Sequence, residues 1–236
     1  MKFKNSIRKI KKIHLKNTLI ARGMVAQKID KDYTKAIKYF RQALDVDPDD
    51  ADEHYNLGVL FQKLNRFEEA EAEYRKSIDI YPGREDVHLN LGCILITMGR
   101  IEDAEKELRE SARINPNNSK VHFNLGNLSV KLNHFEDAEK EYKKAIELDP
   151  EHWTAHFFLS KLLMHIKKDN TDALKHFARS YDLIKKELNK KDKDDADRAY
   201  LYKCLGVCCT NLGKKDEGKD YLKKSNNIMK QINKIK

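Results

Sequence analysis

Every proline in this 236-residue chain falls on one interval, because Pro48, Pro82, Pro116 and Pro150 each lie 34 residues after the one before. Three other columns keep the same interval: Ala36, Ala70, Ala104 and Ala138; Phe40, Tyr74, Leu108 and Tyr142; and Gly58, Gly92 and Gly126. A fixed period of this length in independent columns indicates a repeat array. In such an array each unit buries its apolar face against the next unit.

The pattern inside one repeat predicts two helices. In residues 51–84, an apolar stripe at i, i+3, i+4 and i+7 marks a first helix: His54, Leu57, Gly58 and Phe61. A residue suited to left-handed backbone follows it in four places: Asn65, Gly99, Asn133 and Gly213. Paired acids such as Glu68 and Glu69 then open a second helix, and Pro82 ends it.

Composition agrees with a mostly helical protein. The chain is 40% apolar and 36% charged, with four prolines and nine glycines. The longest apolar run without charge, residues 87–99, is too short to span a bilayer, and the N-terminus does not have the pattern of a secretory signal. Four cysteines without an export signal favour a reducing compartment. We therefore expect a cytoplasmic location, with a mitochondrion or another organelle as the alternative suggested by the basic N-terminus.

The repeated Leu-Gly pair, the later alanine, the aromatic residue four positions on and the closing proline resemble the tetratricopeptide repeat family. The resemblance implies an all-α fold, a right-handed α–α superhelix of about five helix-turn-helix repeats. The expected repeats are residues 17–50, 51–84, 85–118, 119–152, 153–187 and 199–232, with a charged insertion at 188–198. Residues 1–16 would form a basic arm or a capping helix.

The chain has none of the sequence motifs of common catalytic sites. It has no phosphate-binding glycine loop, no Gly-x-Ser-x-Gly and no His-Glu-x-x-His, so we expect neither an enzyme nor a cofactor. One column of histidines occurs once per repeat, at His54, His88, His122 and His156. Neighbouring helices lie about 10 Å apart, too far for these side chains to share one metal, so packing is the favoured role. Metal binding by His152 and His156, and a redox or metal role for Cys204, Cys208 and Cys209, are the lesser alternatives.

A second stripe on each first helix lies about 100° from the packing stripe. In this family, the resemblance implies that such residues line a concave surface where peptides bind. They include Tyr55, Val59, Leu89, Ile96, Phe123, Asn127 and Phe157. The alternative is that some of them fill the space between helix layers.

Asparagines at one position of three consecutive repeats form the most specific column: Asn56, Asn90 and Asn124. Their surroundings, such as Tyr55-Asn56-Leu57-Gly58, are similar to the superhelical repeats of O-linked N-acetylglucosamine transferases, where an asparagine ladder holds a peptide main chain. An amide side chain offers both a donor and an acceptor to an extended backbone. The alternative is that each amide bonds within the scaffold.

We do not expect this chain to contain the carboxylate clamp found in co-chaperones of this family. Asn90 and Lys120 match two of its positions. Tyr55, Val59 and Asn124 occupy the others and lack its charges, so a chaperone C-terminal carboxylate would bind weakly.

Charge is unevenly distributed along the chain. Residues 1–29 contain nine of the 47 basic residues and no acid, and the remaining 38 basic residues equal the 38 acids. This basic arm could cap the array, contact nucleic acid or an acidic membrane, or direct the chain to an organelle.

The expected function is a non-catalytic scaffold or adaptor that binds a peptide segment of a protein partner in its groove. The alternatives are a structural or assembly subunit of a large complex, with the arm against RNA or membrane, and a regulatory partner of a separate enzyme. Homo-oligomerisation is left open.

Overall fold

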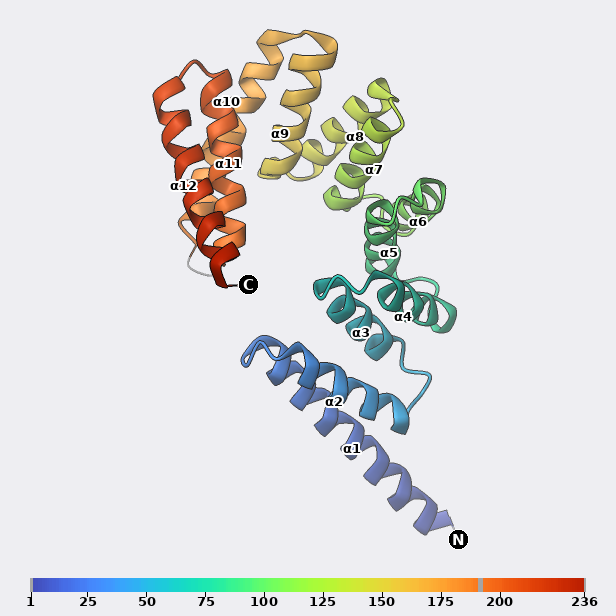
Figure 1. The fold of residues 1–236 in the computed structure, drawn as a ribbon. Coiled ribbons are helices and arrows are strands. Elements are labelled where there is room, and N and C mark those ends of the chain that lie inside the picture. Colours follow the sequence, from blue (N-terminus) through green and yellow to red (C-terminus); the bar gives the residue numbers. More distant parts are fainter. Residues whose placement is uncertain (1, 191–192, 236) are drawn as a thin grey trace. The chain divides into compact units, whose positions relative to one another are not determined.

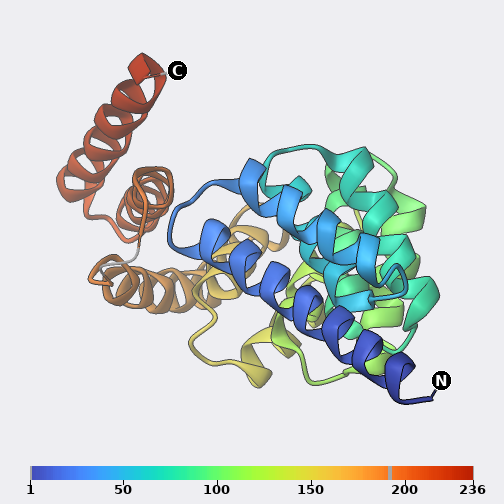
Figure 2. The same cartoon turned by 90° about the horizontal axis from the view of Figure 1, so that it is seen from below.

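The computed structural model describes residues 2–190 and 193–235, and these residues are helical with short connections. They form six consecutive helix pairs (Figures 1 and 2): α1 (Lys2–Lys28) with α2 (Tyr33–Val46), α3 (Ala51–Lys63) with α4 (Phe67–Ile80), α5 (Glu85–Thr97) with α6 (Ile101–Ile114), α7 (Ser119–Lys131) with α8 (Phe135–Leu148), α9 (Trp153–Leu162) with α10 (Asn170–Leu188), and α11 (Asp195–Asn211) with α12 (Lys215–Ile235). A π-helical turn, η1 (Leu163–Lys167), follows α9. The expected all-α fold of paired helices is confirmed. The described residues contain one pair more than the expected count of about five.

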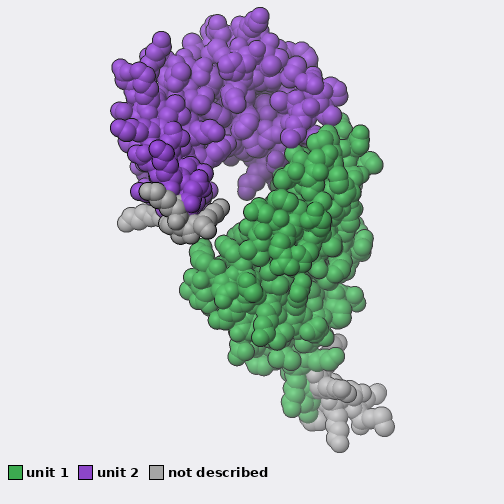
Figure 3. All heavy atoms as spheres, in the orientation of Figure 1, with its two compact units in different colours: residues 1–116 green, residues 117–236 purple. Residues whose placement is uncertain are grey.

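The chain divides into two compact units, residues 1–116 and residues 117–236, which Figure 3 shows in different colours. Unit 1 contains the pairs α1–α2, α3–α4 and α5–α6, and unit 2 contains the other three pairs. Each unit has its own buried side chains: one core cluster in unit 1 centres on Phe40, Phe61 and Tyr74, and two clusters in unit 2 centre on Tyr142 and on Phe177.

The glycine and aromatic columns meet inside the pairs α3–α4 and α7–α8. A Cβ atom on Gly58 would lie 2.5 Å from two ring atoms of Tyr74, and one on Gly126 would lie 2.6 Å from the ring of Tyr142. Both tyrosines are almost completely buried, so only glycine lets the two helices approach this closely. In these two pairs, the glycine and aromatic columns found in the sequence therefore form a direct contact between the two helices.

Left-handed residues end the first helices as expected. Asn65, Gly99, Asn133 and Gly213 have φ of 57°, 78°, 59° and 79°. In the pair α3–α4 the amide of Arg66 closes this corner by donating to the carbonyl of Phe61, five residues back, at 2.9 Å.

Two pairs contain one additional residue at this corner. In α1–α2 and in α9–α10, the left-handed residues are Lys31 and Lys168, with φ of 56° and 57°. The closing bond there spans six residues: Asp32 N donates to Ala26 O at 2.9 Å, and Asp169 N donates to Leu163 O at 3.0 Å. Both corners are thus widened in the same way.

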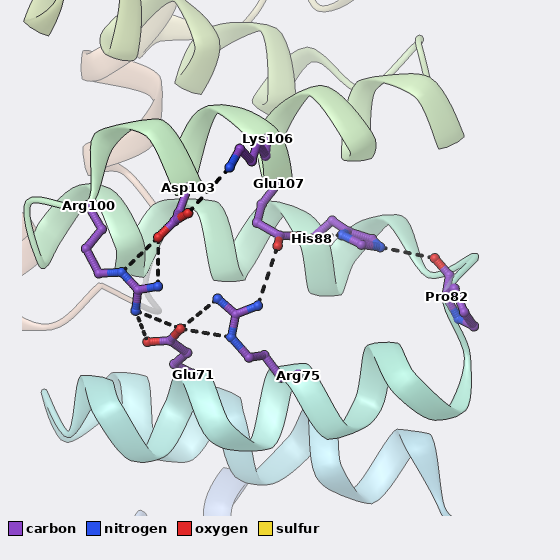
Figure 4. Close-up of polar contacts among 8 residues, drawn as sticks. All are labelled: Glu71, Arg75, Pro82, His88, Arg100, Asp103, Lys106 and Glu107. Carbon is purple, nitrogen blue, oxygen red and sulfur yellow. Dashed lines mark hydrogen bonds and ion pairs between the residues drawn. The ribbon is translucent and has the colours of Figure 1, made fainter.

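The histidine column links the two helices of a pair to the preceding proline. His88 Nδ1 lies 2.7 Å from Glu107 Oε2 on α6, and His88 Nε2 lies 3.1 Å from the carbonyl oxygen of Pro82 (Figure 4). His54 repeats this arrangement with Glu73 and Pro48, at 2.6 and 3.0 Å. These contacts agree with the packing role predicted for the column.

Charged side chains also join neighbouring second helices of unit 1. Arg100, at the start of α6, contacts Glu71 on α4 at 2.7 Å and Asp103 on its own helix at 2.7 Å. Arg75 on α4 contacts Glu71 at 2.8 Å and reaches Glu107 on α6 at 3.9 Å. Figure 4 shows this network connecting α4 and α6 beside His88.

The N-terminal arm is part of the first helix. The boundary expected at residue 16 falls inside α1, which is continuous over 27 residues, so the arm is not a separate capping helix. Lys16 anchors α1 to the end of α2, with its Nζ 2.7 Å from Asp47 and 2.9 Å from Asp50. Side chains of residues 2–5, 8 and 9 lie outside the described part of the structure.

The charged insertion expected at residues 188–198 is shared between two helices and their connection. Leu188 ends α10 and Asp195 begins α11. Within the described residues, no helix is both long enough and apolar enough to cross a membrane.

Candidate functional site

The first helices of unit 1 present a cluster of polar side chains around Tyr55. The guanidinium carbon of Arg84 lies 4.1 Å from the centre of the Tyr55 ring, a cation–π distance. Arg84 is also bonded to Asp86 at 2.9 Å and paired with Asp52, so it joins the start of α5 to the start of α3. Burial, followed by the nearby Asp86 carboxylate, raises the pKa of Tyr55, which therefore stays a neutral hydroxyl.

The asparagine column does not repeat one set of bonds. Asn56 Nδ2 donates to Glu53 Oε1 at a long 3.4 Å, whereas Asn90 Nδ2 donates to the Tyr55 hydroxyl of the preceding repeat at 3.3 Å. In unit 2, Asn124 Nδ2 donates to the carbonyl of Lys120 in its own helix at 2.9 Å. All three asparagines are half-buried. In each, the amide nitrogen has a partner within the scaffold, so the three side chains are not three equivalent free amides.

Apolar residues of the predicted surface divide into two groups. Tyr55, Val59 and Ile96 are partly buried and pack against the core of unit 1. Leu89 is only 8% exposed and Phe157 only 5% exposed. Both side chains therefore offer little exposed surface in the free scaffold, and their role as ligand-facing residues stays a prediction.

In unit 2, Phe123 belongs to an aromatic cluster. Its ring centre lies 5.6 Å from that of Phe158 and 6.0 Å from that of Tyr142. Asn127 is occupied as well, since its Oδ1 accepts from the Tyr142 hydroxyl at 2.7 Å. Lys120 is exposed at the first turn of α7. The sequence placed these residues on one helix face, and the structure shows that most of them pack within the scaffold.

Glu53 was not among the predicted site residues. It lies in the first turn of α3 and is only 2% exposed. Its Oε2 atom has no hydrogen-bond partner in the structure. Burial, the largest influence, raises the pKa of Glu53 to about 7. In the sequence it resembled any acid at a helix start, and only the position of α1 opposite α3 distinguishes it.

An open pocket of about 440 Å³ adjoins Glu53. One wall comes from α1, with Lys16, Ile20 and Met24, and the other from α3, with Glu53 and Asn56. The pocket lies entirely within unit 1. It is thus a concave polar site between two first helices, and of its lining residues only Asn56 was predicted from the sequence to bind a ligand.

The buried cysteines are poorly suited to nucleophilic chemistry. Burial raises the pKa of Cys204 to about 11 and that of Cys208 to about 12. A thiol must ionise to attack or to bind a metal, so these side chains act as small apolar residues in the core of α11. His152 also has a structural partner, because its Nδ1 accepts from the backbone of Ala155 at 3.3 Å. Among the described residues, no group of three or more His, Cys, Asp or Glu side chains is arranged to hold a metal ion.

Comparison with curated proteins gives short matches. The chain is 51% identical over 45 residues to the protein O-mannosyl-transferase TMTC3 of Mus musculus and 47% identical over 45 residues to that of Homo sapiens. Each match covers 19% of this chain and 5% of the relative, so the chain spans only a small part of the length of these proteins.

Solved structures share the fold over most of the chain. PilF of Pseudomonas aeruginosa gives a TM-score of 0.68 at 23% identity, covering 89% of this chain and 90% of that protein. PilW, described as a widely conserved type IV pilus biogenesis factor, gives 0.69 at 18% identity, covering 87% and 90%. YrrB, described as a TPR protein with an unusual peptide-binding site, gives 0.54 at 21% identity, covering 80% and 91%.

Three sequence models described as tetratricopeptide repeats match this chain, at residues 22–85, 68–125 and 119–152. Together they cover residues 22–152, more than half of the chain. The paired helices, the close Gly–Tyr contacts and the left-handed helix ends lie in the same region. The chain therefore belongs to the tetratricopeptide repeat family.

Proposed function

We propose that this chain is a non-catalytic scaffold that binds an extended peptide segment of a protein partner. The binding surface in unit 1 is formed by the first helices α1, α3 and α5, around Tyr55, Asn56 and Asn90. One observation carries the proposal: Asn56, a half-buried amide of the predicted asparagine column, lines an open polar pocket between α1 and α3.

The geometry favours recognition of a peptide main chain. Asn56 holds its present partner at 3.4 Å and Asn90 at 3.3 Å, both longer than a typical hydrogen bond, so a peptide amide could compete for these groups. Asn124 is bonded at 2.9 Å to its own helix backbone and is not assigned to this surface. Membership of the repeat family, and the unusual peptide-binding site ascribed to YrrB, support the same proposal.

The test is selection of peptides from a random library on the full-length chain, followed by calorimetric titration. Changing Asn56→Ala together with Asn90→Ala removes two amide contacts, each of which contributes about 0.5–1.5 kcal/mol. We expect the affinity for a selected peptide to fall at least about tenfold, which corresponds to about 1.4 kcal/mol.

The matched control changes the exposed Asn226 and Asn227 of α12 to alanine, and it should leave the affinity unchanged. Equal affinities in the wild type and in the variant with Asn56→Ala and Asn90→Ala, with the helical circular dichroism preserved, would show that the peptide binds at another site. A library that yields no binding peptide would contradict the proposal itself.

A second candidate function, in assembly of a larger complex, rests on α1. This helix has 27 residues, against 13 in α3 and in α5, and its nine basic residues account for the whole unbalanced positive charge of the chain. Lys11 and Lys12 are exposed on it. Such a helix suits contact with a polyanion such as nucleic acid.

A further inference from the structure

The pocket between α1 and α3 contains two cations of its own, and each is already matched. Lys16 is held by Asp47 at 2.7 Å and by Asp50 at 2.9 Å, and these hydrogen bonds raise its pKa. Arg84, at the rim, is bonded to Asp86 at 2.9 Å and paired with Asp52. Neither side chain is therefore available as a new anion-binding group.

One carboxylate of the pocket has no matching cation. Glu53 is 2% exposed, its Oε1 receives a single long hydrogen bond from Asn56, and its Oε2 has no partner in the structure. A buried carboxylate oxygen without a donor is costly, and the cost is relieved by a proton or by an incoming donor. Burial raises the pKa of Glu53 to about 7, an effect that the hydrogen bond from Asn56 offsets only in part.

The other lining residues favour a long side chain with a polar end. Ile20 and Met24 of α1 supply an apolar wall, which suits a methylene stem. The terminal torsion of a glutamate is soft, so a small rotation turns either carboxylate oxygen of Glu53 toward a donor in the pocket. Asn56 Oδ1 is a second acceptor on the same wall, so the α3 side presents two acceptor groups opposite the apolar side chains of α1.

We propose that this pocket receives the cationic side chain of a lysine or arginine of the bound peptide, with Glu53 as its counter-ion and Asn56 as an additional acceptor. The inference rests on the proposed peptide-binding function and adds the chemistry of one subsite. A charged hydrogen bond of this kind is stronger than a neutral one and gives the pocket selectivity for cations.

The chemistry is first tested with small probes that do not depend on any partner. We would titrate n-butylammonium and n-butylguanidinium into the isotopically labelled full-length chain at pH 8 and follow the amide signals of Glu53 and Asn56 by NMR. Butanol and butyrate have the same stem without the cation. Saturable shifts with either cation and none with butanol or butyrate are expected. Saturation by butyrate, or by all four probes alike, would overturn the proposal.

Two variants sharpen the result. Glu53→Gln keeps the shape and removes the charge, so the dissociation constant of the cation should rise at least about tenfold. Glu102→Gln, at an exposed glutamate in the first turn of α6, is the matched control and should leave it unchanged. Undiminished cation binding by folded Glu53→Gln would mean that groups other than Glu53 bind the cation. The response to ammonium compared with guanidinium distinguishes lysine from arginine.

Because a proton competes with the ligand for Glu53, cation binding should weaken as the pH falls. With a pKa of about 7, the ionised fraction drops about tenfold between pH 8 and pH 6, and the apparent affinity should fall by about the same factor. Asp50, Asp52, Lys16 and Arg84 are the other charged groups of the pocket, and all are paired. An affinity independent of pH over this range would contradict the role of Glu53.

Selection from the peptide library distinguishes a failure of the cation subsite from a failure of the proposed scaffold function. Enrichment of lysine or arginine at one peptide position, lost when the selection is repeated on Glu53→Gln, supports both. Peptides that bind without such a preference overturn the subsite and leave the scaffold function standing. Saturable binding of the small cations with no binding peptide at all overturns the scaffold function and leaves the pocket chemistry standing.

Discussion

His156 and His176 face each other with their Nδ1 atoms 2.9 Å apart and their ring centres separated by 5.1 Å. In the three preceding repeats, the residue opposite the corresponding histidine is a glutamate: Glu73, Glu107 and Glu141. The α9–α10 pair has therefore exchanged an ion pair for two imidazoles, one of which must donate while the other accepts.

This exchange makes unit 2 sensitive to acid. Burial, and then the neighbouring His176, lower the pKa of His156 to about 4. Because the folded pKa lies below the unfolded value, the folded state resists protonation, and stability is lost as the pH falls below about 6.5 toward 4. We expect His176→Glu to remove this loss by giving His156 a counter-ion, and thermal unfolding at pH 5 and pH 7.5 would measure the effect.

The reciprocal change provides the control in unit 1. Glu107→His should create the same sensitivity around His88, whose pKa is raised because hydrogen bonds to Glu107 and to the Pro82 carbonyl outweigh the lowering effect of burial. If neither substitution alters the difference in melting temperature between the two pH values, the imidazole pair does not control acid stability.

Glu53→Gln should stabilise the free protein in alkaline but not in acidic solution. The folded pKa of Glu53, about 7, lies above its ordinary value, so the folded state favours the protonated acid and wild-type stability falls as the pH rises from about 4.5 to 7. A neutral amide avoids that loss, and we expect a gain of about 1–3 kcal/mol at pH 8 and little change at pH 4.5. Denaturant unfolding at both pH values is the measurement. A loss of stability at pH 8 would mean that another group stabilises the ionised carboxylate.

Gly58→Ala should destabilise unit 1 because the new methyl group would lie 2.5 Å from the ring of Tyr74. That ring is fully buried and its hydroxyl donates to Gln62 at 2.7 Å, so it cannot move aside. Overpacking of this kind costs about 1–3 kcal/mol, which exceeds the gain in helix propensity of about 1 kcal/mol at most sites. Gly83→Ala, with its nearest atoms at 3.6 Å, is the control and should unfold like the wild type.

The charge of α1 can be tested without cutting into the fold. Truncation at residue 16 would remove the lysine that binds Asp47 and Asp50, so substitution is preferable. Changing Lys2, Lys4, Lys11 and Lys12 to glutamine should weaken binding to duplex DNA and reduce the salt slope by up to about 0.9 per charge. The same four changes to arginine keep the charge and should keep the binding. An unchanged slope in the glutamine variant would contradict a polyanion-binding role for α1.

The sequence was sufficient to predict the repeat and the helix pairs, because these depend on residues spaced regularly along the chain. Gly58 with Tyr74 and the left-handed Asn65 are examples, since each follows from local geometry. Roles of surface residues were less predictable. Asn56, Asn90 and Asn124 share a column, yet each bonds to a different partner, because the neighbouring residues differ from repeat to repeat.

The sequence pattern also could not predict which side chains of the site are buried. Leu89 and Phe157 are almost completely buried, although the periodicity placed them on the second stripe of their helices. Glu53 owes its surroundings to α1, more than 25 residues earlier in the chain, where Ile20 and Met24 occupy the opposite wall of the pocket. A single column cannot reveal a property that arises from two different helices.

The widened corners at Lys31 and Lys168 bear on how this architecture tolerates changes in length. In both places an additional residue is taken up by a hydrogen bond that spans six residues, and the second helix still begins directly after the capping aspartate, Asp32 or Asp169. Ala36 and Ala173 consequently remain completely buried, as Ala70 does in a repeat of ordinary length. The packing of the paired helices therefore does not depend on whether the segment that connects them contains this additional residue. The corner is thus the natural point at which to graft a loop or a reporter sequence without disturbing the stack.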